Sequence, residues 1–379
     1  MKKDKILIIE NSIHLTGALK SITRSSFDLS NHFEFLFVIP KHSKGRFWIE
    51  NKGFSKIFEL PMRELSRRLP SLVLYVPFLI LNSIRLKKIL KTNNVDIIHI
   101  NDVYNLLPVA IRLLGNSTPY VCHFRFLPDR FPALLLKFWL MLHFRFASKI
   151  VAVSENVRRQ LPNHPKVIVI HNELPVDERY PIISNDQGEK TSYGFLYLSN
   201  FMEGKGQALA LKAFSRIHHQ LSNWTLRFVG GDMGLAKNRK YREGLRELGK
   251  ELGIDQKLEW CDFADDVELE YKKADIVLNF SESESFSITC LEAMFYGRPL
   301  IASDCGGPSE IVSHMATGLL VENRNVAKMS EAMLSLATNP KLRLTLAKNA
   351  REQVRHKFNI RNTSYILKDV YNESRLKTR

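Results

Sequence analysis

The stretch SESESFSITCLEAMFYGRPLIASDCGGPSEIV occupies residues 281–312 and follows an apolar run, DIVLNF. This run predicts a buried strand, SESESF a polar loop, and SITCLEAMFY a short helix that ends at Gly297, with Pro299 soon after. RPLIASD then predicts a second strand, and DCGGPSEIV a second turn into a helix that Pro308 would start. Two consecutive strand–loop–helix units are typical of a parallel sheet with helices on its faces.

The same alternation extends over the whole chain in two series. The first series of apolar runs comprises KILIIE, FEFLFVIP, VDIIHI, PYVCHF, KIVAVS and KVIVIHN. The second comprises YGFLYLSN, WTLRFVGG, LEWCDF, DIVLNF, RPLIASD and TGLLVE. Between them lies LPVDERYPIISNDQGEKTS, whose Pro, Gly, Asp and Ser content is typical of a linker. Continuous apolar runs suit parallel strands that are covered on both faces.

We therefore predict two doubly wound, Rossmann-like α/β domains that face a central cleft. The N-terminal domain would span residues 1–175, the linker 176–192, and the C-terminal domain 193–360. A C-terminal helix in residues 361–379 would pack back on the N-terminal domain. Ligands of such domains bind at the carboxyl ends of the strands, so the polar residues that follow each strand are the candidates for a site.

The charge is unevenly distributed along the 379 residues, whose formal net charge is +16. Residues 1–190 hold 28 Lys/Arg against 16 Asp/Glu, and residues 191–379 hold 27 against 23. This excess indicates an anionic partner for the first half, such as a nucleic acid, a phosphorylated acceptor or an anionic lipid surface. Because no nucleic-acid-binding motif is present, we expect no nucleic-acid partner.

Neither a disulfide framework nor a zinc site is predicted, because none of the four cysteines lies in a CxxC pattern: Cys122, Cys261, Cys290 and Cys305. The N-terminus begins like a signal peptide, but its apolar run, Ile6–Ile9, is too short. The stretch 69–84 comes closest to a membrane span, and Pro77 interrupts it. We expect a cytoplasmic protein, either free or bound at the inner surface of the membrane.

Two carboxylates of the opening stretch, Glu284 and Glu292, flank the predicted start of its helix. A helix N-terminus offers free backbone N–H groups and a positive dipole end, which suit a phosphate. Ionised carboxylates make strong hydrogen bonds to hydroxyl groups. The two acids could therefore hold sugar hydroxyls on both sides of a diphosphate, as a nucleotide-sugar presents them. Solvated surface acids at this spacing are the ordinary alternative.

Other strands are followed by weaker motifs. EGKG, residues 203–206, places Lys205 between glycines as a clamp for a diphosphate. Gly17 could bring backbone N–H groups close to a phosphate, although the GxGxxG fingerprint is absent. His123 ends a strand and is suited to hydrogen bonding and proton transfer near neutral pH. The ordinary alternatives are a solvated lysine for Lys205, a structural histidine for His123 and, for the DCGGPSEIV motif, a plain turn between a strand and a helix.

Together, the order and spacing of these motifs resemble the family-4 retaining glycosyltransferases of GT-B fold, also called group 1 glycosyltransferases. The similarity covers nearly the whole chain, through TGAL, HIND, VAVSENV, VIHN, EGKG, FVGGDMG and TGLLVE. Its specific part is the block 281–312, in which ESFSITCLEAM looks like the family's E–x7–E signature.

This resemblance implies a nucleotide-diphosphate sugar as donor, bound mainly by the C-terminal domain, and transfer with retained configuration without a metal or another cofactor. Glu284 would face the donor sugar, Lys205 would neutralise the diphosphate, and His123 would lie near donor sugar and acceptor, as the catalytic residues. The expected donor-binding residues are Gly17, Asn200, Lys205, Gly230, Glu284, Ser285, Phe286, Ser287, Ile288 and Glu292, the last for the ribose hydroxyls. The acceptor-side candidates are His14, Asn101, Asp102 and Arg125.

The chain departs from the family at two positions. Asn200 stands where the family often has an arginine, so one contact to the diphosphate is missing or is supplied by another residue. Ser287 stands where the family usually has a glycine. Both departures affect how the donor would be bound more than they affect the resemblance to the family.

These features predict sugar transfer to a glycan or lipid-linked acceptor during synthesis of a cell-surface polysaccharide, such as lipopolysaccharide, capsule or exopolysaccharide. Residues 63–88 and 124–149 mix cations with bulky apolar side chains, which indicates docking to an anionic membrane or, equally, core helices with basic outer faces. Two further alternatives remain: another GT-B enzyme, such as a sugar-nucleotide epimerase or a phosphorylase, and a non-catalytic protein that binds an anionic ligand.

Overall fold

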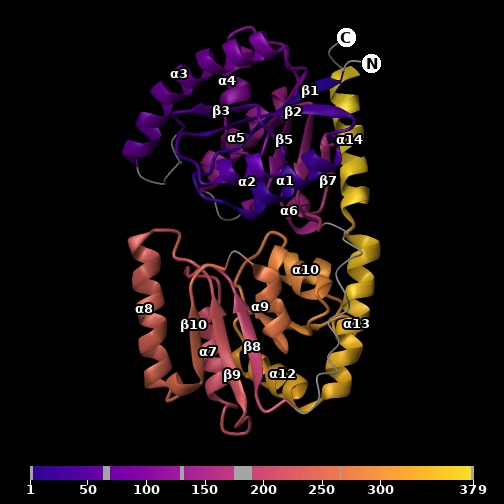
Figure 1. The fold of residues 1–379 in the computed structure, drawn as a ribbon. Coiled ribbons are helices and arrows are strands. Elements are labelled where there is room, and N and C mark those ends of the chain that lie inside the picture. Colours follow the sequence, from indigo (N-terminus) through magenta and orange to yellow (C-terminus); the bar gives the residue numbers. More distant parts are fainter. Residues whose placement is uncertain (1–2, 63–68, 129–131, 175–189, 265, 377–379) are drawn as a thin grey trace. The chain divides into compact units, whose positions relative to one another are not determined.

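The computed structural model describes the chain except for residues 1–2, 63–68, 129–131, 175–189, 265 and 377–379. The chain divides into two compact units, Met1–Pro175 with Ile360–Arg379, and Val176–Asn359. Most of the predicted linker, 176–192, lies outside the described residues. Each unit contains one parallel sheet with helices packed on it (Figure 1).

The described part of the first unit contains a seven-stranded parallel sheet in the order β3-β2-β1-β4-β5-β6-β7. Its strands are β1 (Asp4–Ile9), β2 (Phe33–Pro40), β3 (Ile57–Leu60), β4 (Ile97–Ile100), β5 (Tyr120–Phe124), β6 (Lys149–Ala152) and β7 (Val167–Val169). The interior strand β1 is buried on both faces, since Ile6 to Ile9 are all fully buried. The sequence predicted each strand except β3, whose four residues include a charged side chain, Glu59.

The helices of the first unit include one from the far end of the chain. They are α1 (Gly17–Asp28), α2 (Gly45–Asn51), α3 (Leu69–Asn93), α4 (Leu107–Leu113), α5 (Ala133–Phe146), α6 (Glu155–Arg159) and α14 (Ile360–Leu376). Helix α14 packs against α1, β4 and β5. Its fully buried Tyr371 contacts Phe33 edge-on and lies 2.8 Å from Nδ1 of His99 through its hydroxyl. The predicted return of the C-terminal helix to the first domain is confirmed.

Helix α3 corrects one expectation, because it continues through Pro77 instead of being interrupted there. Pro77 lies on the exposed side of the helix, where the carbonyl left without a partner by the missing N–H can be hydrated. Among the described helices, neither α3 nor any other combines the length and the hydrophobicity that a bilayer span requires.

The described part of the second unit contains a six-stranded parallel sheet in the order β10-β9-β8-β11-β12-β13. The strands are β8 (Tyr193–Leu198), β9 (Trp224–Val229), β10 (Leu258–Cys261), β11 (Ile276–Asn279), β12 (Leu300–Asp304) and β13 (Leu319–Glu322). The helices are α7 (Gln207–Ser215), α8 (Ala236–Glu251), η2 (Asp255–Lys257), α9 (Val267–Lys273), α10 (Ile288–Phe295), α11 (Gly307–Ile311), α12 (Val326–Thr338) and α13 (Pro340–Lys357). All six strands match predicted runs, so two doubly wound α/β domains are confirmed.

Three neighbouring strands of the second sheet, β8, β11 and β12, position the candidate site. Parallel pairing places Ile276 beside Phe195 and Asn279 beside Ala302. The carboxyl ends of these strands therefore lie at one edge of the sheet. Their loops carry EGKG, SESESF and DCGGP, which the pairing brings together from positions about 100 residues apart in the chain.

Candidate functional site

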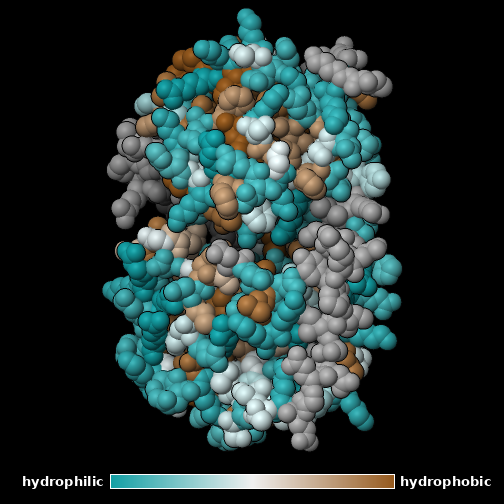
Figure 2. Space-filling view, in the orientation of Figure 1, coloured by the Kyte–Doolittle hydropathy of each residue, from teal (hydrophilic) through white to brown (hydrophobic). Residues whose placement is uncertain are grey.

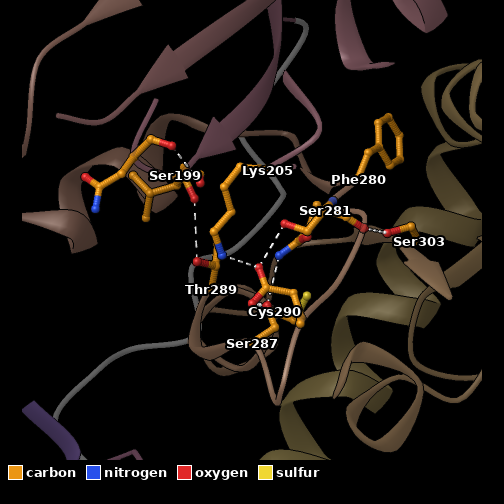
Figure 3. Close-up of polar contacts among 12 residues, drawn as sticks. Ser199, Lys205, Phe280, Ser281, Ser287, Thr289, Cys290 and Ser303 are labelled. Atoms are coloured by element: carbon orange, nitrogen blue, oxygen red, sulfur yellow. Dashed lines mark hydrogen bonds and ion pairs between the residues drawn. The ribbon is translucent and has the colours of Figure 1, made fainter. Parts of the chain in front are cut away.

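An ion pair between two of these loops forms the centre of the candidate site. The carboxylate oxygen Oε1 of Glu284 accepts hydrogen bonds from Nζ of Lys205 at 2.7 Å and from Oγ of Ser281 at 2.8 Å. Figure 3 shows the Lys205 side chain extending toward the start of α10. The side chains of Lys205 and Glu284 are 26% and 15% exposed, so a ligand can reach both. The structure thus joins two residues that are 79 positions apart.

The loop of Lys205 is fixed by Tyr197, a buried residue of β8. The Tyr197 hydroxyl donates to the Lys205 carbonyl at 2.5 Å and accepts from the Phe280 N–H at 2.8 Å. A Cβ at Gly206 would lie 2.0 Å from the Phe280 carbonyl oxygen, and the φ of Gly206 is +78°. Only glycine fits this position without strain. The close approach fixes the lysine loop against the end of β11.

The DCGGP loop packs against the backbone of the carboxylate loop. The N–H of Gly307 donates to the Glu284 carbonyl at 2.8 Å. A Cβ at Gly307 would come within 2.3 Å of the Phe286 Cα. The glycine therefore lets α11 begin directly beside the loop that carries Glu284. The two strand–loop–helix units of residues 281–312 therefore lie side by side.

Ser287 starts α10 in a backbone conformation that favours glycine. Its φ is +83°, in the left-handed region. The Ser287 hydroxyl accepts hydrogen bonds from the Cys290 N–H at 3.4 Å and from Nδ2 of Asn279 at 2.9 Å. The side chain thus caps the helix, which offsets part of the strain of placing serine in a backbone conformation that favours glycine.

Glu292 lies on the first turns of α10 and is half-buried. The hydroxyl of Tyr271, a buried residue of α9, lies 3.2 Å from Oε2 of Glu292 and 3.2 Å from the carbonyl oxygen of Thr289, and its one proton is shared between these two acceptors. Burial and the neighbouring Glu292 carboxylate raise the pKa of Tyr271, so the phenol stays protonated and donates. The Tyr271 ring stacks on Tyr296 with centroids 5.0 Å apart, which fixes the donor. This arrangement orients the carboxylate of Glu292.

The loops after β8 and β9 approach each other closely. Oδ1 of Asn200 accepts a hydrogen bond from the Gly231 N–H at 3.3 Å, and its carbonyl accepts from Nε2 of Gln207 at 2.9 Å. A Cβ at Gly230 would lie 1.9 Å from the Ser199 carbonyl oxygen. In this structure, Asn200 and Gly230 shape the backbone at the edge of the sheet.

The remaining donor-side candidates of the second unit differ in exposure. Ser285 and Ile288 are half-buried and lie beside the start of α10. Phe286 is buried, and its ring contacts that of Phe358 at a centroid distance of 5.7 Å. Its side chain thus packs in the core, while its backbone forms part of the loop. The donor-binding roles of all these residues stay predictions.

Polar side chains also gather at the carboxyl edge of the first sheet, around Arg125. Its Nε donates to Oδ1 of Asn101 at 3.0 Å, and its Nη1 donates to Oδ1 of Asn172 at 2.6 Å. Nδ2 of Asn101 in turn donates to Oε2 of Glu10 at 2.6 Å. Glu173 accepts from the hydroxyl of Ser25 at 2.6 Å. Asn101 and Arg125 therefore belong to one buried network.

Burial dominates the electrostatics of this network. It raises the pKa of Glu10, Asp102 and Glu173, and the positive charge of Arg125 counteracts the rise at each of them. Burial also lowers the pKa of Arg125 itself to about 10, which leaves the guanidinium charged at neutral pH. The charge of Arg125 thus acts on three buried carboxyl groups, and the neighbouring Glu10 carboxyl further raises the pKa of Asp102.

His123 lies inside the first sheet and is only 4% exposed. Neither ring nitrogen has a hydrogen-bond partner among the described residues. Burial, followed by the charges of Arg125 and His99, lowers its pKa well below the ordinary value. The ring is therefore neutral at pH 7 in this structure, so it can donate or accept a hydrogen bond but does not titrate near neutral pH.

The other first-unit candidates lie between β1 and α1. His14 is half-buried, and its N–H donates to Oγ of Ser12 at 3.1 Å. Gly17 is exposed and is the first residue of α1, which Thr16 caps through the Leu19 N–H. An exposed glycine at a helix N-terminus leaves its backbone accessible to a ligand.

Two family models match adjoining parts of the chain. Glycosyl transferases group 1 matches residues 181–353, and Glycosyltransferase Family 4 matches residues 53–178. The chain belongs to the group 1 and family 4 glycosyltransferases.

Relatives of this glycosyltransferase align over part of their length. An uncharacterized glycosyltransferase from Haemophilus influenzae is 27% identical over 190 residues, 50% of this chain and 48% of the relative. The lipopolysaccharide 1,6-galactosyltransferase of Escherichia coli is 27% identical over 187 residues, 47% of this chain and 49% of the relative. The chain thus spans about half the length of these curated relatives.

Solved structures share the fold over nearly the whole chain. Anabaena HepE, crystallised with UDP and glucose, has a TM-score of 0.81 at 20% identity, covering 97% of this chain and 99% of its own. A glycosyltransferase from Rickettsia africae has a TM-score of 0.80 at 18% identity, covering 99% of both chains. The glycosyltransferase described here therefore has the GT-B fold.

Sequence reasoning missed the side chains that hold the site of this glycosyltransferase in place. Tyr197, Tyr271 and Asn279 lie inside strands or helices. At such positions the sequence alone does not distinguish them from ordinary core residues. Glu10 and Glu173 follow strands of the first sheet, and their position after a strand was the available signal. Tyr197, Glu10 and Glu173 contact residues more than 80 positions away, whereas Asn279 contacts Ser287 only eight positions away.

Proposed function

We propose that this glycosyltransferase moves a sugar from a nucleotide-diphosphate sugar to a glycan or lipid-linked acceptor, with retention of configuration and without a metal or another cofactor. The observation that carries the proposal is the accessible pair of Lys205 and Glu284 beside the start of α10. It combines a cation, a helix N-terminus and a carboxylate, which suit a diphosphate and a sugar respectively.

Glycosyl transfer proceeds through an oxocarbenium-like state with a departing diphosphate, so stabilising negative charge on the leaving group is the main task. The ammonium of Lys205 and the first N–H groups of α10 would supply that stabilisation. Lys205 would form an ion pair with a bound diphosphate instead of with Glu284. The carboxylate would then be left to accept hydrogen bonds from the donor sugar.

Glu292 would bind the ribose hydroxyls of the nucleotide. Glu292 lies on α10, whereas Glu284 lies on the loop before it, and the hydroxyl of Tyr271 contacts the Glu292 carboxylate. HepE crystallised with UDP-glucose supports a uridine nucleotide as the first donor to test. The lipopolysaccharide galactosyltransferase among the relatives supports a role in cell-surface polysaccharide synthesis and a hexose as the transferred sugar.

The first unit would dock on the anionic cytoplasmic face of a membrane, where a lipid-linked acceptor is found. Helices α3, α4 and α5 contain Lys and Arg at seven positions and no Asp or Glu. Two stripes of exposed apolar side chains run along them: Val76, Ile80 and Ile84 on α3, and Leu134, Phe138 and Met141 on α5. Figure 2 shows hydrophobic side chains where Figure 1 places α3 and α4.

Cations beside exposed apolar side chains are the combination that binds anionic bilayers, with about 1 kcal/mol contributed by each Lys or Arg near the surface. In liposome co-sedimentation at low salt, we expect wild-type protein to bind anionic vesicles. Ile80→Asp with Ile84→Asp should weaken binding, whereas Leu344→Asp, which alters an exposed leucine of α13, should not. Equal binding by all three proteins would contradict the docking surface.

The transfer proposal is tested by incubating the protein with radiolabelled UDP-sugars and membranes from cells that lack the enzyme. We expect labelled product with wild type and with Glu282→Gln. Glu282 lies on the same loop as Glu284, but its carboxylate pairs with Arg324, which follows β13. Lys205→Gln and Glu284→Gln should lose most of the product. The anomeric signal of the product, measured by NMR, would show inversion if the retaining mechanism is wrong.

A further inference from the structure

Three cationic side chains surround the indole ring of Trp48 at the surface of the first unit. Nζ of Lys20 lies 5.3 Å from the ring centroid, Nζ of Lys52 lies 5.5 Å from it, and Cζ of Arg24 lies 5.9 Å from it. Lys20 and Arg24 are one turn apart on α1, while Lys52 directly follows α2, the helix of Trp48. Each of the four residues is half-buried, and lysine and arginine lay their stems on apolar surface while their charged heads stay in water. These four residues form the Trp48 face.

The Trp48 face carries an excess of positive charge. Arg24 and Lys52 form no ion pair with any residue that the structure describes. Residues 17–28 and 41–52, which include α1 and α2, hold six Lys/Arg against two Asp/Glu. One of these two acids, Glu50, is already paired at 2.8 Å with an arginine of α2. The three cations of the face repel one another, so an anion bound among them would be attracted by all three.

The face continues from the carboxyl edge of the first sheet, where acceptor-side candidates lie. Helix α1 follows β1, so its first residue, Gly17, lies at this edge. Gly17, Lys20 and Arg24 follow one another at spacings of three and four residues, which places them on one side of the helix. At about 1.5 Å per residue, Arg24 lies about 10 Å along α1 from Gly17. An acceptor chain that leaves the edge along α1 would therefore pass over the Trp48 face.

The surface over α1 and α2 differs from that of the proposed membrane-docking helices. In Figure 2 it mixes hydrophilic side chains with separate hydrophobic ones, whereas exposed apolar side chains form stripes on α3 and α5. Phe47, next to Trp48 on α2, is 71% exposed. Aromatic rings stack on the apolar C–H faces of pyranose sugars, and lysine and arginine pair with carboxylate or phosphate groups. Cations around accessible aromatic rings therefore suit a sugar that carries an acid group, while a bilayer requires a continuous apolar face.

We propose that the Trp48 face binds an acidic sugar residue of the acceptor, away from the hydroxyl group that receives the transferred sugar. Lys20, Arg24 and Lys52 would pair with the carboxylate or phosphate of that residue. The exposed ring of Phe47 would contact the C–H face of a neighbouring sugar in the chain. Trp48 would hold the three cations in place through their contacts with its ring. The inference rests on the proposed transfer to a sugar-containing acceptor and names the charge of that acceptor as the feature that is recognised.

The test measures binding of hexagalacturonate, in which each sugar carries one carboxylate, by ligand-observed NMR at low salt. It is compared with maltohexaose, a neutral chain of the same length, and with a hexa-aspartate peptide, which carries as many side-chain carboxylates without sugars. No donor is added, so the readout does not require transfer. Hexagalacturonate should bind about tenfold more tightly than either of the others, a difference of about 1.4 kcal/mol. Added salt should weaken its binding, because salt screens exposed charges.

Two variants separate charge from stacking. Arg24→Gln with Lys52→Gln removes two cations of the face and should reduce the preference over maltohexaose to less than about threefold. Phe47→Ser leaves the charge unchanged and should weaken binding of hexagalacturonate about threefold without affecting hexa-aspartate. The control is Lys212→Gln with Arg216→Gln, which removes the same charge from two exposed positions of the second unit and should keep the wild-type preference.

Equal binding of hexagalacturonate and either comparison ligand by wild type would overturn the inference, as would a preference that survives in the double variant of Arg24 and Lys52. Loss of anionic-vesicle binding by that double variant, with the preference unchanged, would assign the face to a membrane instead. Stabilisation by nucleoside diphosphates is measured on the same samples and should persist in every variant. If that stabilisation is present while the preference is absent in wild type, the assignment of the face is wrong and the proposed donor chemistry stands. If it is absent while the preference is present, the opposite holds.

Discussion

Replacing Tyr197 by phenylalanine removes one hydroxyl group that holds the candidate donor loop. The Tyr197 ring is buried in the second unit, and its hydroxyl bridges the Lys205 carbonyl and the Phe280 N–H. The substitution keeps the ring and its packing. It therefore separates the two hydrogen bonds from the hydrophobic contacts of the same residue.

The loss of the hydroxyl costs a different free energy at each of the two groups that it bonds. Phe280 is fully buried, so its N–H is left without water or another partner, at a cost of about 1–3 kcal/mol. Lys205 is half-buried and its carbonyl can be partly hydrated, so we take about 1 kcal/mol, the net value of an ordinary hydrogen bond. Tyr197→Phe should thus lower the free energy of unfolding of the second unit by about 2–4 kcal/mol.

The assay is urea unfolding followed by tryptophan fluorescence. The second unit contains Trp224 and Trp260, so Trp48 and Trp139 of the first unit are changed to phenylalanine in every protein compared. The control is Tyr193→Phe on the same strand, four residues away. Its ring is half-buried and stacks on Trp224, and its hydroxyl makes no hydrogen bond to the described residues.

We expect Tyr193→Phe to change the unfolding free energy by less than about 0.5 kcal/mol. We also expect Tyr197→Phe to weaken nucleoside diphosphate binding, because the Lys205 backbone is released. If the two variants unfold within 0.5 kcal/mol of each other at equal urea dependence, the hydroxyl bridge does not hold the loop. The reasoning that derives the lysine position from Tyr197 would then be refuted.

Three further predictions concern strain, pH and close packing. Ser287→Gly should be more stable than Ser287→Ala by about 1 kcal/mol in urea unfolding, since both lose the cap and only alanine keeps a Cβ at positive φ; equal stability would contradict the strain. Burial lowers the pKa of His143 to about 4, so below pH 6.5 the unfolded chain binds a proton that the folded chain does not, and stability falls as pH falls toward 4. Between pH 7 and 5 wild type should lose about 2 kcal/mol more than His143→Gln in urea unfolding, and parallel pH profiles would exclude this. Gly307→Ala should lower the melting temperature measured by calorimetry, because its Cβ would collide with the Phe286 backbone, whereas the exposed Gly244→Ala should not lower it.

Much of the fold could be predicted because the apolar runs are short, regular and separated by polar helices. The strand β3 was missed because its pattern mixes half-buried and exposed residues. The path of α3 through Pro77 was missed because a proline normally breaks a helix, and its tolerance depends on which face of the helix meets solvent. That face is decided by tertiary packing.

The loops that form the candidate site could be predicted from the sequence, but the contacts between their residues could not. The sequence placed Lys205 and Glu284 each after a strand, and the topology of parallel sheets brings such loops together. It did not reveal that Tyr197 and Gly206 fix the lysine loop, because their partner Phe280 lies more than 70 positions away. The three cations around Trp48 likewise come together only in the folded chain.

The measurement that tests the central claim most directly is thermal stabilisation of the protein by UDP, GDP and ADP. We expect one of them to stabilise wild type, by about 2.7 kcal/mol at a hundred times its dissociation constant. Glu292→Gln should lose most of this shift, whereas Glu282→Gln should keep it. No shift with any nucleotide, or an undiminished shift in Glu292→Gln, would contradict a donor site at the start of α10.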